Sequence, residues 1–282
     1  MGYNYDAELA TLLEFLPDTS LTISNPVQAR AEFLQLLSLL TADLDTSGVV
    51  IEDRMIAGPA GAPDVPVRVY TPEGLNATVP GILHIHGGGF VIGNLDGEQG
   101  TCLALSRGLG VVVVSVDYRL APETPYPGPL EDCYAALEWT STHSAQLHID
   151  PARLAVFGLS AGGGLSAATA LLARDRGGPP ICFQYLGIPE LDDRLQTPSM
   201  QRFVDMPMWN RPNAELSWDF YLGEQYQRGA DDVVWCAAWG HVDAQRQLEA
   251  DEVLEHRSDL LTPLVGVEVA EDVQLGVLAP AL

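Results

Sequence analysis

The stretch "LAVFGLSAGGGLSAATALLA", residues 154–173, constrains the fold more than any other part of the sequence. Its first part has the apolar run of a buried strand, and its second part has the small and apolar residues of a packed helix. Between them lies a serine flanked by small residues, Gly158-Leu159-Ser160-Ala161-Gly162. G-x-S-x-G at a strand-to-helix junction permits the strained turn that exposes a nucleophilic hydroxyl. The alternative is a serine that only packs in a tight turn.

The neighbouring segments alternate between strand and helix patterns. "GILHIHGG" and "VVVVSVDYRL" are short β-rich runs, and a helical pattern lies between them. Strand–helix–strand order is the mark of a parallel sheet. The expected further elements are an antiparallel pair at 49–58 and 65–72, a helix at 129–144 and a strand at 181–189. The sequence therefore predicts an α/β fold with a mostly parallel sheet and helices on both faces.

The domain organisation follows from what the sequence lacks. We find no internal repeat and no low-complexity linker, so residues 1–282 are expected to form a single domain. Residues 1–45 have helical spacing that breaks at Asn25-Pro26. Residues 195–226 are rich in Met, Trp, Pro and Tyr and match no strand of the sheet. We expect these two segments to form a small helical cap over a pocket.

Composition restricts the partners. The net charge is −24, and all 14 basic residues are arginine. Such a surface repels nucleic acid and anionic membranes, so neither is expected as a partner. It favours a small neutral substrate, or an anionic one only where an arginine receives it.

Cofactor and compartment are predicted from missing signals. The four cysteines have no zinc or redox spacing, so no metal and no cofactor are expected. The N-terminal sequence has no secretion signal, and no apolar run reaches the length of about 18 residues that a membrane span needs. A cytoplasmic location is expected.

A second motif, "HIHGGGF" at residues 84–90, follows an expected strand. Consecutive glycines leave backbone N–H groups open, and acyl transfer needs such donors where negative charge develops on a carbonyl oxygen. Phosphate binding is the alternative, but the G-x-x-x-x-G-K-[ST] pattern is absent and the glycines do not open a G-x-G-x-x-G helix. His86 is expected to shape the loop rather than to act as a base.

Three stretches carry a family resemblance: "HIHGGGFVIGN", "VSVDYRLAPETPYPGPLEDCYAAL" and "VFGLSAGGGLSAA". In this order they resemble the hormone-sensitive-lipase branch of the α/β-hydrolases, the HGGG esterases, over about residues 50–226. The resemblance implies the α/β-hydrolase fold and a carboxylesterase that acts on short-chain esters through a serine acyl-enzyme. It assigns the oxyanion hole to Gly88, Gly89 and Ala161, and loop shaping to His86 and Gly87.

Two features depart from this family. Leu159 stands where the family most often has Asp, which changes local hydrogen bonding but removes no triad member. The Asp-Pro-x-x-Asp-Glu stretch and the His-Gly turn that would carry the acid and the base are absent. After Ser160 only His241 and His256 remain, and the alternative is that both are exposed surface histidines.

The acid is no easier to assign. In this fold the acid precedes the histidine, whereas Asp259 and Asp272 both follow His256. Asp243 and Asp251 precede it but share its short helical stretch, a poor geometry for a triad. His256, Asp259 and Asp272 are therefore weak candidates.

The C-terminal segment, residues 230–282, differs in composition from the rest. It contains no Tyr or Phe, eleven acidic residues and two arginines, a net charge of −9. We interpret this as divergence from the family near residue 230 by frame change, exon exchange or truncation. An incomplete fold would leave an open sheet edge and favour a homodimer. The alternative function is then an inactive or impaired paralogue that binds a ligand without turning it over.

Overall fold

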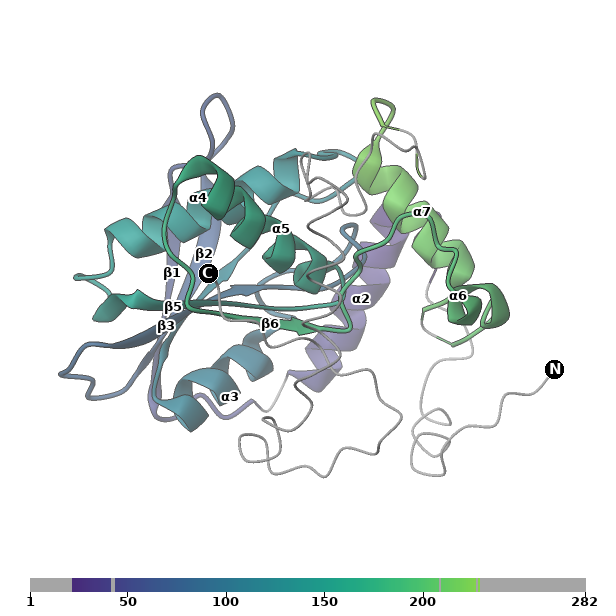
Figure 1. The fold of residues 1–282 in the computed structure, drawn as a ribbon. Helices are drawn as coiled ribbons and strands as arrows, with labels where there is room; N and C mark the ends of the chain where they lie inside the picture. Colours follow the sequence, from purple (N-terminus) through teal and green to yellow (C-terminus); the bar gives the residue numbers. More distant parts are fainter. Residues whose placement is uncertain (1–21, 42–43, 208, 227, 229–282) are drawn as a thin grey trace.

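The structure is a computed structural model that describes residues 22–41, 44–207, 209–226 and 228. A six-stranded sheet forms its centre, in the order β1-β2-β4-β3-β5-β6 (Figure 1). The strands are β1 (Val49–Ile56), β2 (Val65–Pro72), β3 (Val79–Ile85), β4 (Val112–Val116), β5 (Ile149–Leu159) and β6 (Phe183–Gly187). β2 pairs antiparallel with both β1 and β4, and the other neighbours pair in parallel. The sheet is therefore mixed and mostly parallel beyond its first strands.

Helices cover both faces of this sheet. In Figure 1, α3 (Gln99–Leu109) lies on one side, and α4 (Gly128–Thr142) and α5 (Ala161–Arg176) lie on the other. All five residues of β4 are buried. This fits its valine-rich sequence, because helices cover both faces of the sheet at this central strand. The buried apolar residues form two clusters. The sheet therefore separates two apolar cores, and loops connect the ends of its strands to the helices.

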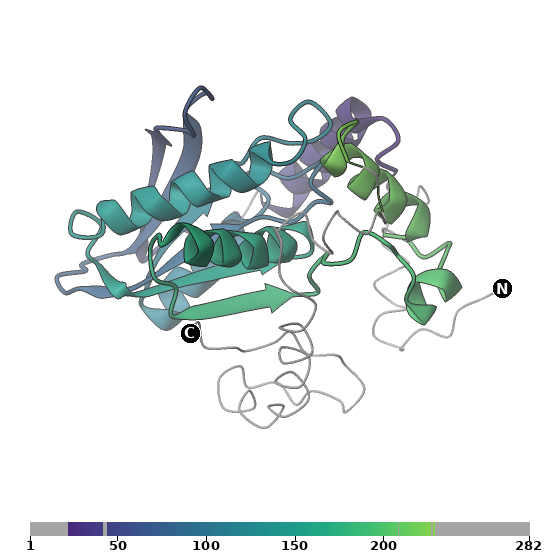
Figure 2. The same cartoon turned by 45° about the horizontal axis from the view of Figure 1, so that its top comes forward.

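The remaining helices gather at one end of the sheet. They are α2 (Pro26–Leu40), α6 (Pro198–Arg202) and α7 (Arg211–Leu222). Both views show α2 and α7 side by side (Figures 1 and 2). The backbone N–H of Ile23 donates to Asn213 Oδ1 at 3.4 Å, which joins the segment before α2 to α7.

One arginine anchors α2 to the loops at the strand ends. Arg30 donates to the carbonyl oxygens of Val91 and Ala121 at 2.8 Å each and pairs with Glu123 at 2.7 Å. Hydrogen bonds from a charged donor contribute about 1.5–3 kcal/mol each. These contacts hold α2 over the loop that follows β3.

The expected α/β fold is confirmed, including the antiparallel pair at the start and the strand–helix order. β5 begins at Ile149, five residues before the strand expected from sequence. Segment 195–226 forms α6 and α7 around irregular chain, and its role as a cap stays a prediction. The predicted helix before Asn25 and the C-terminal segment lie outside the described residues. No helix in the described ranges is long and apolar enough to span a membrane.

Candidate active site

Ser160 lies on a sharp turn between β5 and α5. Its φ of 55° and ψ of −124° are an unusual combination for a residue with a side chain, and such strain is kept mainly at functional sites. Its backbone N–H donates to Gly187 O at 2.8 Å, and its carbonyl oxygen accepts from Glu190 at 3.1 Å and Gly164 at 3.0 Å. Three backbone hydrogen bonds thus fix the serine at the carboxyl end of the sheet.

The glycines around the serine are required by close backbone packing. A Cβ on Gly158 would collide with the carbonyl of Gly162. A Cβ on Gly162 would collide with the carbonyl oxygen of Ile85 and come within 2.5 Å of His86 O. The predicted strand–turn–helix geometry is therefore present, and it leaves the serine beside the end of β3.

Sheet topology brings the glycine loop to the serine. Ile85 at the end of β3 pairs with Gly158 of β5, so the segment after β3 begins next to Ser160. A Cβ placed on Gly87 would lie 3.5 Å from the Cβ of Ser160. Gly88 and Gly89 have φ values of 116° and 55°, in the region that favours glycine. The two sequence motifs are thus adjacent, and Ala161 begins α5 directly after the serine.

The His86 side chain is part of the loop rather than free to react. Its Nδ1 lies 2.8 Å from Gly87 O, and its ring stacks on Tyr118 at 4.1 Å between centroids. Burial lowers the pKa of His86 to about 4, so the ring is neutral at pH 7. A neutral ring must carry its proton on Nδ1 to donate to Gly87 O. These contacts are those expected of a loop-shaping residue, a role that stays a prediction.

No other histidine in the described part of the chain is placed as a base for Ser160. Burial lowers the pKa of His84 to about 3. His148 directly precedes β5, at the opposite end of that strand from Ser160. His143 ends α4. The sequence-based candidates that lie outside the described residues are His241, His256, Asp243, Asp251, Asp259 and Asp272.

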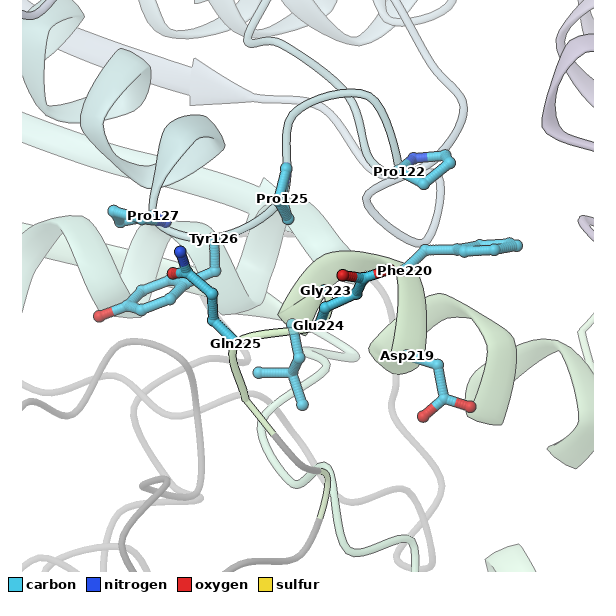
Figure 3. Close-up of a pocket in the computed structure, with 10 residues that line it drawn as sticks. Pro122, Pro125, Tyr126, Pro127, Asp219, Phe220, Gly223, Glu224 and Gln225 are labelled. Atoms are coloured by element: carbon cyan, nitrogen blue, oxygen red, sulfur yellow. The ribbon is translucent and has the colours of Figure 1, made fainter.

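Two cavities lie near this end of the sheet. The one that includes Ser160 has a volume of about 210 Å³ and is also lined by Phe33, Asn94, Glu98 and Leu159. A larger one of about 730 Å³ lies between residues 122–127 and the end of α7, and Ser160 does not line it. Figure 3 shows its lining, including the side chains of Tyr126, Asp219 and Glu224. The smaller cavity is the one that chemistry at Ser160 would use.

Two partly buried acids near the serine were missed by the sequence analysis. Glu98 precedes α3 and lines the smaller cavity. Burial raises its pKa, while Thr101 and the backbone N–H of Gly87 lower it. The sequence feature that could have identified Glu98 is its position at the start of the helix that follows the glycine loop.

Glu190 follows β6 and is the second missed acid. The pKa of Glu190 is raised to about 8 because burial disfavours the charged form, and a hydrogen bond with the Ser217 side chain opposes this effect only in part. Its Oε2 atom has no hydrogen-bond partner among the described residues. The Ser217 hydroxyl donates to Gly89 O at 3.0 Å, so Glu190, α7 and the glycine loop meet at one point. Its position directly after a parallel strand was the available signal, because strand carboxyl ends share one edge.

No group of three or more His, Cys, Asp or Glu side chains in the described ranges could hold a metal ion.

Leu159, which stands where the family most often has Asp, packs its side chain against Gly187 and lines the smaller cavity. At this position the chain therefore makes an apolar contact.

Comparison with known proteins agrees with this geometry. A family profile described as an α/β hydrolase fold matches residues 82–255. Carboxylesterase NlhH of Mycobacterium tuberculosis is 41% identical over 215 residues, which cover 76% of this chain and 66% of that protein. Esterase LipI of the same species is 43% identical over 176 residues, 62% of this chain and 54% of that protein.

Solved structures show the same likeness. A bacterial heroin esterase superposes with a TM-score of 0.79 and 48% identity, over 83% of this chain and 73% of that one. Esterase LipW from Mycobacterium marinum superposes with a TM-score of 0.67 and 39% identity, over 73% of this chain and 65% of that one.

The chain spans just under two thirds of the length of the first curated relatives it matches. The family profile covers more than half of this chain, and it includes both the glycine loop and the serine turn. The chain therefore belongs to the α/β-hydrolase family, in its hormone-sensitive-lipase branch.

Proposed function

We propose that the chain hydrolyses small carboxylic esters through Ser160. The observation that carries the proposal is the strained turn at Ser160 beside the loop of Gly87, Gly88 and Gly89. The proteins it resembles include a carboxylesterase and a heroin esterase, whose names support the same reaction class. Short acyl groups fit best, because the cavity at the serine has a volume of only about 210 Å³.

The reaction follows from these groups. Ser160 Oγ attacks the ester carbonyl and forms a tetrahedral intermediate, whose oxyanion accepts hydrogen bonds from the backbone N–H groups of Gly88, Gly89 and Ala161. The alcohol leaves with a proton and an acyl-enzyme remains. Water then attacks the acyl carbon, releases the carboxylic acid and restores the serine hydroxyl.

The reaction also needs a base to accept the serine proton. His86 is unsuited, because its Nδ1 is committed to Gly87 O and its pKa is about 4. His241 and His256 stay the candidates for the base, and Asp259 and Asp272 stay the weak candidates for the acid. If neither histidine reaches Ser160, the alternative function is an inactive paralogue that binds a ligand without hydrolysing it.

The test is covalent labelling together with turnover. We expect a fluorophosphonate to label the protein and p-nitrophenyl acetate to be hydrolysed, with Ser160→Ala losing both. His241→Ala and His256→Ala identify the base, since only the correct one lowers kcat by orders of magnitude. Absence of labelling and of turnover in the wild-type chain would overturn the proposal in favour of the paralogue.

Four finer expectations accompany this proposal. From the composition, the substrate is expected to be a small neutral ester. A cytoplasmic location and a homodimer stay predictions from the sequence. The single-domain organisation, with 1–45 and 195–226 as the cap, is proposed here on the packing of α2 beside α7.

A further inference from the structure

The cavity that includes Ser160 contains a carboxyl group that has no cationic partner among the residues the structure describes. Glu98 lines it with its side chain 21% exposed. Some acids near the sheet pair with arginine, since Arg68 contacts Asp53 and Asp96 and Arg119 contacts Asp132, but Glu98 does not. Within the described residues, the nearest basic group to Glu98 is His84 Nε2 at 3.7 Å.

His84 does not neutralise this carboxylate. Burial lowers the pKa of His84 to about 3, so the ring carries no charge at pH 7. His86, which also lines the cavity, is neutral for the same reason. No arginine lines the cavity among the described residues. Hydrogen bonds from Thr101 and the backbone N–H of Gly87 favour the charged form of Glu98. They supply no full positive charge, so a cationic group of a ligand in this partly buried site would add to the stabilisation of the carboxylate.

An aromatic ring completes the chemistry. Phe33 of α2 lines the same cavity as Glu98 and Ser160. Its ring also packs near Gly97, the residue before Glu98, where an added Cβ would lie 3.4 Å from the ring. A carboxylate and an aromatic face in one small cavity form the combination that recognises ammonium groups.

We propose that this cavity binds a positively charged group of the ester, with Glu98 supplying the opposite charge and Phe33 an aromatic face. The proposal rests on the ester hydrolysis proposed above and names the charge of its substrate. The substrate class is then an ester whose acyl or alcohol part carries a compact ammonium group within a few bonds of the carbonyl. Anionic esters are excluded by the same carboxylate.

An isosteric pair of esters tests the charge alone. The p-nitrophenyl esters of 4-(trimethylammonio)butanoate and 5,5-dimethylhexanoate have the same shape and differ by one positive charge. We expect the wild-type kcat/KM to be higher for the cationic ester. In Glu98→Gln the cationic-to-neutral ratio should fall roughly tenfold, because the substitution removes the carboxylate charge that attracts the ammonium group in a partly desolvated site. The ratio cancels any effect of the substitution that both substrates share.

Glu224→Gln is the matched control. It removes one carboxylate from the larger cavity, which Ser160 does not line, and so changes the net charge equally. We expect the ratio in Glu224→Gln to stay at the wild-type value. An unchanged ratio in Glu98→Gln, or an equal fall in both variants, would overturn the proposal and leave Glu98 as a support for Gly87.

Ligands that cannot be hydrolysed distinguish a failure of the charge assignment from a failure of the hydrolysis proposal. 5-(Trimethylammonio)-2-pentanone and 6,6-dimethyl-2-heptanone form the corresponding ketone pair and bind without turnover. If the chain hydrolyses neither ester, a tighter Kd for the cationic ketone that is lost in Glu98→Gln still supports the charge assignment. Equal Kd values for the two ketones contradict it.

Discussion

At the scale of single residues, the site depends on where glycine is required. The serine turn and the glycine loop could be predicted from sequence because each requirement is local: a strained backbone at Ser160 and two glycines in left-handed conformations. The contact between Gly162 and the end of β3 joins these motifs through backbone atoms alone. Substitution there should therefore disturb both motifs together.

Gly162→Ala is predicted to destabilise the protein by about 1–3 kcal/mol, because its Cβ collides with the carbonyl oxygens of Ile85 and His86. Esterase activity should fall as well, since the glycine loop must shift. Urea unfolding and p-nitrophenyl acetate turnover measure the two effects. Gly108→Ala is the control: an added Cβ meets nothing within 4 Å, and alanine in a helix should gain about 0.5–1 kcal/mol. Equal stabilities of the two variants would contradict the packing argument.

Glu190 shows what residue patterns do not reveal. Its position after β6 was readable, but its burial beside Ser217 depends on α7, which comes more than twenty residues later. The sequence analysis therefore did not single out Glu190. The raised pKa has a measurable consequence for stability.

The free energy of unfolding should depend on pH through Glu190. Its folded-state pKa of about 8 lies above its ordinary 4.5, so the folded protein keeps a proton that the unfolded chain releases. The contribution to stability is complete below pH 4.5 and is lost as pH rises towards 8. Glu190→Gln lacks this loss, so its stability relative to wild type should rise with pH by about 1 kcal/mol per unit within that window. Parallel pH profiles of the two proteins in urea titrations would refute the assignment.

At the scale of elements, the sheet was predictable and the helices at its end were only partly so. Strand–helix alternation predicts the parallel strands because each pattern is periodic. The helical spacing of 26–40 was equally visible, but its partner was not, since Arg30 reaches backbone carbonyls of residues 91 and 121 that no side-chain pattern marks. The tertiary contact, rather than the periodicity, decides that α2 supplies Phe33 to the cavity.

Arg30→Ala is predicted to loosen α2. Loss of its hydrogen bonds to Val91 and Ala121 should raise amide exchange across 26–40 and increase KM more than it lowers kcat. Hydrogen exchange with mass spectrometry and steady-state kinetics measure both. Arg54→Ala serves as the control, because its surface pair with Glu52 contributes little. Unchanged exchange in α2 would show that packing alone holds the helix.

At the scale of the whole molecule, charge dominates. The net charge of the 282 residues is −24, and all of the basic residues are arginine. Composition gives the total charge, but it does not reveal which acids are neutralised, because pairing such as that of Asp132 with Arg119 is set by the fold. The segment 230–282 adds −9 to this charge and lies outside the described residues. The predicted base and acid therefore rest on sequence alone.

Salt should stabilise the folded chain. Screening of the acidic surface reduces repulsion, and raising NaCl from 10 to 200 mM is expected to add about 1 kcal/mol, a rise in Tm of about 2–4 °C. Differential scanning calorimetry measures it, with sucrose of equal osmolality as the non-ionic control. The same rise in sucrose would attribute the effect to solvent exclusion instead of screening.

The anchoring of α2 by backbone carbonyls has an evolutionary consequence. Ser160 and the glycine loop follow strands of the sheet, whereas Phe33 in the wall of the cavity comes from α2, which precedes all of these strands in the chain. Mutations in that helix can exchange the wall without touching the strained turn. Within one lineage, new substrate preferences can then accumulate by drift in α2 while the reaction itself is inherited unchanged.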